Sequence, residues 1–271
     1  MTEPSTGPRE DPYARAEYRR VIAWGPRIER ERPFLLSLLE RAPDRSVVDL
    51  GCGTGEHVAF FAEAGARAIG IDRSEDMISQ ARDHEARGKG RFVVGFIQEA
   101  DRVLAGEPRF GMAISLGNTL PHVHEDEELA TILRAAHALL LPGGVLAIQI
   151  LNYRRIIERG LRHLPINFRP DSESENEGDA QREVVFLRLM SPVSERRILF
   201  FPTTLVLDPT SEEPVRIERS RRVELRPWTD RELGPALESA GFEVELFGDM
   251  KGGAFDPLES SDLVVVGTRK A

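Results

Sequence analysis

The fold of this chain is decided by residues 47–56, which read VVDLGCGTGE. An apolar run ends in Asp49-Leu50, and glycines then occupy the alternate positions 51, 53 and 55 before a helical pattern begins. Glycine is needed where the backbone adopts torsions that other residues avoid, or where a ligand approaches the main chain closely. The stretch therefore predicts a buried strand, a ligand-binding loop and a helix in succession.

The residues that follow repeat this alternation of strand and helix as far as Leu151. Ser74, followed by Glu75 and Asp76, has the composition of a helix N-terminus. Continuous apolar strands separated by helices are typical of a parallel sheet that is covered on both faces. The predicted strands are 46–50, 66–71, 92–97, 111–116 and 145–151, and the predicted helices are 56–64, the segment from Ser74, and 125–141.

The flanking segments have other patterns. Residues 1–12 are polar and proline-rich and are predicted to be disordered, and residues 13–41 predict two helices interrupted at Trp24-Gly25-Pro26. Residues 152–226 contain candidate strands in series without helices, which indicates an antiparallel insert. These strands are 183–189, 198–206 and 216–225; a helix at 229–240 and strands at 243–247 and 263–268 complete the chain.

Together these patterns predict an α/β protein with a Rossmann-like, doubly wound and mostly parallel sheet of about seven strands. We expect an N-terminal tail and helical lid in residues 1–45. The core is expected to comprise residues 46–151 and 227–271, and the antiparallel β cap to comprise residues 152–226.

The composition excludes several classes of protein. The 271 residues carry a net charge of −9, which disfavours nucleic-acid and anionic-membrane partners. The single cysteine, Cys52, excludes an intramolecular disulfide framework and a multi-cysteine zinc site. No apolar run approaches the roughly 20 residues of a membrane span, and the N-terminus lacks the apolar segment of a secretory signal. We expect a soluble cytoplasmic protein with a small-molecule substrate, and homo-oligomerisation stays open.

Two acidic residues indicate the kind of ligand. The glycine spacing is G-x-G-x-G instead of the G-x-G-x-x-G of dinucleotide sites, and Asp49 at the strand end would repel a diphosphate but attract an ammonium group. Asp72 ends the second strand 21 residues after Gly51, where a carboxylate accepts hydrogen bonds from ribose hydroxyls. The pattern therefore favours an adenosine-containing ligand with an amino-acid tail and no phosphates.

At this point the chain resembles the class I S-adenosylmethionine-dependent methyltransferases, and within them it is similar to the glycine and sarcosine N-methyltransferases. Residues 49–55 resemble the D-x-A/G-x-G-T-G loop of that family, and residues 116–122, LGNTLPH, resemble its more specific L-G-N-S-F-x-H stretch. Shorter matches are residues 24–27 with W-x-x-R, 99–102 with E/Q-A-N/D-W, Asn152-Tyr153 with N-Y-D, and 247–251 with L-G-D-F-K.

The resemblance implies S-adenosylmethionine as cofactor, S-adenosylhomocysteine as product, and no metal. It implies that Arg27 pairs with the cofactor carboxylate, that Asp101 and Arg102 border the adenine, and that a tyrosine covers the sulfonium. Asn118 and Tyr153 are the candidate catalytic residues, because a carbonyl or hydroxyl oxygen can orient the acceptor. The candidate cofactor-binding residues are Tyr13, Tyr18, Trp24, Arg27, Asp49, Gly51, Gly53, Asp72, Arg73, Asp101, Arg102, Leu116, Gly117 and His122.

The chain departs from the family at the acceptor site. Leu151 stands where the family has an arginine for the carboxylate of the acceptor, and Arg154 stands where it has an acid. We therefore expect glycine and sarcosine to be poor acceptors and a larger, less anionic small molecule with an amine or hydroxyl to be the substrate. Arg169 is a candidate to supply the missing positive charge.

Methyl transfer is an in-line displacement that needs positioning, exclusion of water and a neutral nucleophile. We expect an amine nitrogen as acceptor, with an O-methyltransferase as the alternative. An RNA methyltransferase, a nucleotide-dependent dehydrogenase and a non-catalytic cofactor-binding protein are weaker alternatives. The acidic charge, the short glycine spacing and the covering insert, respectively, disfavour these three.

Overall fold

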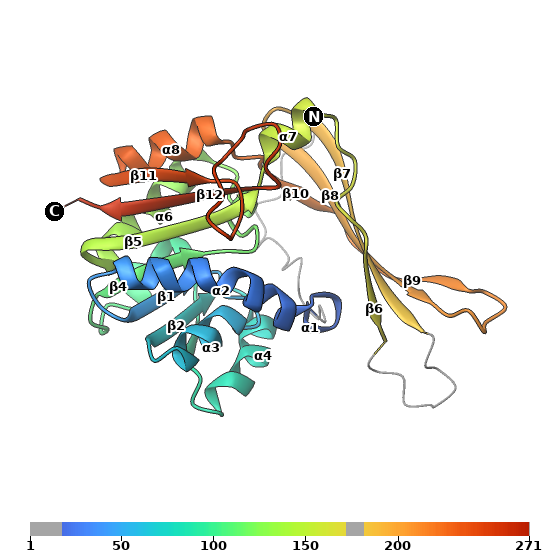
Figure 1. Ribbon diagram of the computed structural model, residues 1–271, viewed down its shortest axis with the longest axis horizontal. Coiled ribbons are helices and arrows are strands. Elements are labelled where there is room, and N and C mark those ends of the chain that lie inside the picture. Colours follow the sequence, from blue (N-terminus) through green and yellow to red (C-terminus); the bar gives the residue numbers. More distant parts are fainter. Residues whose placement is uncertain (1–17, 172–181, 271) are drawn as a thin grey trace, which may run out of the picture.

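The computed structural model describes residues 18–171 and 182–270, and its centre is a seven-stranded sheet (Figure 1). The strands lie in the order β11-β12-β5-β4-β1-β2-β3. The first five strands along the chain are parallel to one another, while β12 is antiparallel to both β5 and β11. The bounds are β1 Ser46–Leu50, β2 Arg67–Asp72, β3 Arg91–Val94, β4 Phe110–Ser115, β5 Leu140–Leu151, β11 Phe242–Phe247 and β12 Asp262–Arg269. The predicted doubly wound, mostly parallel sheet is confirmed.

Helices cover both faces of this sheet because its buried strands present apolar side chains alternately to each side. Val47 belongs to the apolar cluster beneath α2, α3 and α4, whereas Val48 belongs to the cluster beneath α5, α6 and α8. The bounds are α2 Trp24–Arg41, α3 Glu56–Glu63, α4 Glu75–Glu85, α5 Ala100–Val103, α6 Asp126–Leu139 and α8 Asp230–Ser239. None of the helices in residues 18–171 and 182–270 is long and apolar enough to cross a membrane.

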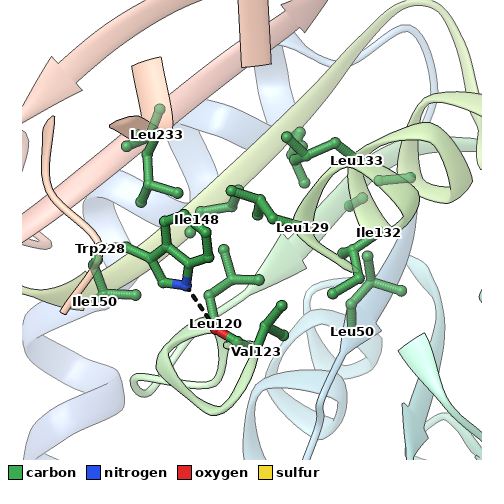
Figure 2. Close-up of a cluster of buried hydrophobic side chains, with 14 of the residues drawn as sticks. Leu50, Leu120, Val123, Leu129, Ile132, Leu133, Ile148, Ile150, Trp228 and Leu233 are labelled. Carbon is green, nitrogen blue, oxygen red and sulfur yellow. Dashed lines mark hydrogen bonds between the residues drawn. The ribbon is translucent and has the colours of Figure 1, made fainter. Parts of the chain in front are cut away.

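Trp228 anchors the loop that follows β4. Its side chain is buried among the apolar residues drawn in Figure 2, and its indole nitrogen donates a hydrogen bond of 3.0 Å to the carbonyl oxygen of Val123. Leu120 and Val123, from the loop itself, are buried in the same cluster. The loop after β4 is therefore fixed from its apolar side, which leaves its polar residues facing the edge of the sheet.

A second sheet, with strand order β10-β8-β7-β6 and with β9 paired to β8, projects from one end of the large sheet (Figure 1). All of its pairings are antiparallel, as the series of candidate strands predicts. The strands are β6 Asn167–Pro170, β7 Glu183–Ser194, β8 Arg197–Leu207, β9 Val215–Ser220 and β10 Val223–Leu225.

Several predicted boundaries differ from the structure. Trp24-Gly25-Pro26 does not interrupt a helix but forms the first turn of α2. Proline is tolerated there because backbone N–H groups in the first turn have no partner within the helix. The helix before it, α1, spans only Tyr18–Val21. Strand β5 begins at Leu140, because Leu140 pairs with Phe110 before the Pro-Gly-Gly segment. The sequence patterns missed β6, which pairing with β7 creates, and the helix α7 Tyr153–Glu158, which Asn152 caps.

The short helix α1 joins the two sheets through consecutive arginines. Arg19 pairs with Glu56 at the start of α3, with 2.8 Å between the guanidinium and carboxylate atoms. Arg20 points the other way and pairs with Asp171 after β6 at 2.8 Å and with Glu218 of β9 at 3.1 Å. Because one residue reaches the core and the next reaches the insert, α1 holds the second sheet against the edge of the large one.

Candidate functional site

The glycine loop connects β1 to α3 and takes a shape that side chains would prevent. Gly51 has φ +90°, and a Cβ atom there would lie 2.4 Å from the Cγ2 of Thr119. Gly53 has φ +53°, and nothing lies within 4 Å of its Cβ position. The first glycine thus lets the loop pack against the β4 loop, while the second leaves backbone open to a ligand.

Asp72 is held at the end of β2 by the same loop. Its two carboxylate oxygens accept hydrogen bonds of 2.9 Å from the backbone N–H groups of Gly53 and Ser74. Ser74 also caps α4, since its hydroxyl oxygen accepts a hydrogen bond from the N–H of Met77. The Asp72 carboxylate is therefore fixed in orientation at the edge of the cavity.

Asp49 lies beneath the loop at the end of β1 and is 2 % exposed. Burial and the nearby negative charge of Asp72 raise the pKa of Asp49 to about 8, and the positive charge of Arg27 opposes this rise. Desolvation disfavours the ionised form, and two neighbouring carboxylates disfavour it further. A positively charged ligand group beside Asp49 would favour its ionised form again, so this part of the site suits a cation better than an anion.

Arg27 belongs to a chain of ionisable groups that runs from the cavity into the core. Its Nε donates to Glu31 at 2.8 Å, and the other Glu31 oxygen lies 2.8 Å from Nε2 of His57. Glu31 is buried, yet its hydrogen bond to His57 and the charge of Arg27 lower its pKa to about 2 against the effect of burial. The Trp24 ring packs edge-on against His57, and the Arg27 guanidinium lies 5.0 Å from the Trp24 ring centre.

Asn118 follows β4 and is the only residue other than glycine with positive φ, 71°, in the described part of the chain. Its side-chain oxygen accepts hydrogen bonds from the N–H of Leu151 and from the hydroxyl of Tyr153, both at 3.1 Å. Its amide nitrogen donates to the same hydroxyl at 2.9 Å. The Asn118 carbonyl is thus already used to fix the end of β5, which weighs against its predicted role in orienting the acceptor.

Tyr153 does not take the catalytic position that the sequence predicted. Its side chain is completely buried, it does not line the cavity, and burial raises the pKa of its hydroxyl. The reason is local, because Tyr153 begins α7 and points into the apolar core behind Asn118. We therefore regard Tyr153 as a positioning residue for Asn118.

A cavity of about 1190 Å³ lies over this edge of the sheet, where the strands β1, β2, β4 and β5 end. Ligands of open α/β sheets bind at this carboxyl edge. The cavity brings together ten of the predicted cofactor-binding residues and one of the two predicted catalytic residues. They are Trp24, Arg27, Asp49, Gly51, Gly53, Asp72, Arg73, Leu116, Gly117 and His122, with Asn118.

Of the other four predicted cofactor-binding residues, two do not line this cavity and two have side chains that the structure does not describe. Asp101 and Arg102 are exposed on α5 and do not line it; Ile97, Gln98 and Glu99, just before that helix, line it instead. Tyr13 lies outside the described residues, and the structure describes the backbone of Tyr18 in α1 but not its side chain.

The sequence reasoning also missed residues on the far side of the cavity. Asn167, Phe186, Arg188 and Phe200 come from the second sheet, and Asp249, Met250 and Lys251 come from the loop between β11 and β12. The short FGDMK match was a signal for the second group. No sequence signal marked the residues of the second sheet, because the alternating pattern of a strand does not show which of its faces meets a ligand. Arg169, singled out above as a candidate cation, does line the cavity.

Comparison with known proteins agrees with this geometry. Residues 47–144 match the family model described as a methyltransferase domain. The solved structure of the CcbJ methyltransferase from Streptomyces caelestis is 25 % identical, covers 91 % of this chain and 96 % of its own, and superposes with a TM-score of 0.66. The chain has the class I methyltransferase fold.

Two curated methyltransferases each match about half of the chain. A glycine/sarcosine N-methyltransferase of Parasynechococcus marenigrum is 32 % identical over 146 residues, and a trans-aconitate 2-methyltransferase of Delftia acidovorans is 36 % identical over 145 residues. These matches cover 52 % and 50 % of this chain, and the chain spans about half the length of each relative, 50 % and 52 %. The resemblance to glycine/sarcosine N-methyltransferases is confirmed.

Proposed function

We propose that this chain is an S-adenosylmethionine-dependent methyltransferase that acts on a small molecule, with an amine nitrogen as the acceptor. The observation that carries the proposal is the pair of carboxylates, Asp49 and Asp72, that faces the cavity beneath an open glycine loop. A dinucleotide would bring a diphosphate to this position, where the charge of Asp72 repels it and no cation favours the ionised form of Asp49. A ligand with a ribose, an ammonium group and a sulfonium suits it.

The residues present fit this cofactor. Asp72 is oriented to accept from the ribose hydroxyls, and Asp49 and Arg27 offer opposite charges to the ammonium and carboxylate of the methionine part. The indole nitrogen of Trp24 is buried and makes no hydrogen bond within residues 18–171 and 182–270, so it is a donor available to the ligand. When bound, S-adenosylmethionine supplies a methyl group on a positively charged sulfur, and the electron pair of the broken bond stays on that sulfur.

The chain itself contributes position and exclusion of water. The second sheet lines the side of the cavity opposite the glycine loop, and the α1 arginines hold it there. The acceptor nitrogen forms its new bond to carbon with a lone pair, so it must arrive uncharged; its surplus proton leaves after transfer. No buried nucleophile is required, which agrees with a Cys52 thiol whose pKa is raised by burial.

An oxygen acceptor is the second candidate, because His122 and Glu128 both line the cavity beside the β4 loop. Either group can take the proton of a hydroxyl, which a neutral amine does not need. Mass spectrometry of the methylated product, before and after mild alkaline hydrolysis, separates a methyl ester from a methylamine, and fragmentation separates an ether from both.

Calorimetric titration of the protein with S-adenosylmethionine and S-adenosylhomocysteine tests the proposal. We expect both to bind, and NADH and ATP not to bind. Transfer is then followed with labelled methyl groups over a panel of amines and hydroxyl compounds. Failure of both sulfur ligands to bind at millimolar concentration would show the proposal to be wrong.

A further inference from the structure

The second sheet presents one mixed face to the cavity. Asn167 of β6 lies opposite Phe186 of β7 in the antiparallel register, and opposite residues share a face. Because side chains alternate along a strand, Arg169 and Arg188 lie on that same face. The cavity-lining residues of this sheet, together with one from the segment before β6, are Leu164, Asn167, Arg169, Phe186, Arg188 and Phe200.

Arg169 is the unusual member of this face. Its Nε is buried, and its guanidinium makes no hydrogen bond or ion pair with any residue in the ranges 18–171 and 182–270. The nearest acid in sequence, Asp171, pairs instead with Arg20 at 2.8 Å and with Arg182 at 3.6 Å. A buried donor without a partner, such as this Nε, carries a free-energy cost that an anionic ligand accepting from the guanidinium would reduce.

Arg188, whose Nε is also buried, differs from Arg169 because its guanidinium contacts neighbouring residues. Its terminal nitrogen donates to the carbonyl oxygen of Pro165 at 3.1 Å, and its guanidinium carbon lies 6.0 Å from the centre of the Phe186 ring. Arg188 therefore adds positive charge while being held by its own neighbours. The two phenylalanines supply apolar surface beside the two cations.

We propose that the methyl acceptor carries both a carboxylate, which Arg169 binds, and an apolar ring, which contacts Phe186 and Phe200. The inference rests on the proposed function and specifies its substrate class. This proposal replaces the earlier expectation of a less anionic acceptor. That expectation followed from Leu151, which stands where the family has an arginine, whereas Arg169 can bind the carboxylate from the second sheet. The cavity of about 1190 Å³ exceeds the usual size of a single-ligand pocket, about 300–1,000 Å³, so it holds a cofactor and a ring-bearing acceptor together.

The test uses the full chain saturated with S-adenosylhomocysteine, whose affinity is measured first. The probes are benzoate, phenylacetate and hydrocinnamate, each compared with its uncharged carboxamide by calorimetry. We expect at least one acid to bind about tenfold or more tightly than its amide, since a charge-assisted pair distinguishes them. Arg169→Gln should abolish this preference without changing the affinity for S-adenosylhomocysteine. Arg169→Lys should keep part of the preference, because it retains the charge but loses the planar fork.

Arg216→Gln is the matched control, because it removes one positive charge from an exposed position of β9 in the same sheet that does not line the cavity. This variant should keep the full preference for the acid. The proposal is overturned if no acid binds more tightly than its amide, or if Arg169→Gln retains the preference. Absence of S-adenosylhomocysteine binding would instead overturn the proposed function, so the two failures are distinguishable.

Discussion

Asp49→Asn should stabilise the ligand-free protein, and increasingly so as the pH rises. In the folded chain the pKa of Asp49 is about 8, whereas its ordinary value is 3.8. Between these values the unfolded chain has released the proton while the folded chain still binds it. The folded state therefore binds more protons, and its free energy of unfolding falls as the pH rises from 3.8 to about 8.

The size of this effect follows from the two pKa values. Each pH unit within the interval lowers the stability of the unmodified protein by about 1.4 kcal/mol, or about 6 kcal/mol across it. Asparagine has nearly the same shape but no charge, so it removes this dependence. Its amide must also be satisfied in a buried position, at a cost of about 1–3 kcal/mol. The variant should therefore be about equal in stability at pH 5 and about 3 kcal/mol more stable at pH 8.

Urea unfolding at pH 5, 6, 7 and 8 measures this difference directly. Asp101→Asn makes the same chemical change at an exposed position of α5 and should show a flat difference over the same range. A constant difference between Asp49→Asn and the unmodified protein from pH 5 to pH 8 would falsify the reasoning. The same variant should bind S-adenosylmethionine more weakly, because it offers no negative charge to the ammonium group.

Three further predictions concern the cofactor and the acceptor. Asp72→Ala should weaken S-adenosylmethionine binding about tenfold or more by calorimetry, since it removes a charged acceptor; unchanged affinity would contradict the ribose assignment. Arg27→Lys should weaken binding and also lower the ligand-free unfolding free energy by about 1 kcal/mol, because Arg27 pairs with the buried Glu31. Arg32→Lys on the same helix, which should change neither, is its control. Millimolar glycine or sarcosine should give little labelled product, because neither has an apolar ring to contact Phe186 and Phe200; efficient turnover would show that the chain shares the activity named for its relatives.

Sequence patterns alone were sufficient for the core of the fold. Val47 and Val48 predict a strand buried on both faces, and Ser74 predicts the start of α4. These features are local, since apolar periodicity and capping act over a few residues. The glycines at alternate positions predicted the ligand loop for the same reason, because the positive φ values of Gly51 and Gly53 are a property of single residues.

Tertiary structure alone decided what the polar residues do. Whether Tyr153 faces a ligand or the core depends on how α7 packs, and whether Arg169 is paired depends on Asp171 binding Arg20, which is 151 residues away in sequence. The edge strand β6 exists because β7 pairs with it, and its own four residues carry no period to predict it. A residue's partner across the chain depends on long-range geometry, whereas its backbone preference depends on its neighbours. For this reason the sequence predicted the sheet edge where we propose that the cofactor binds, and only the folded chain placed the residues of the second sheet beside that edge.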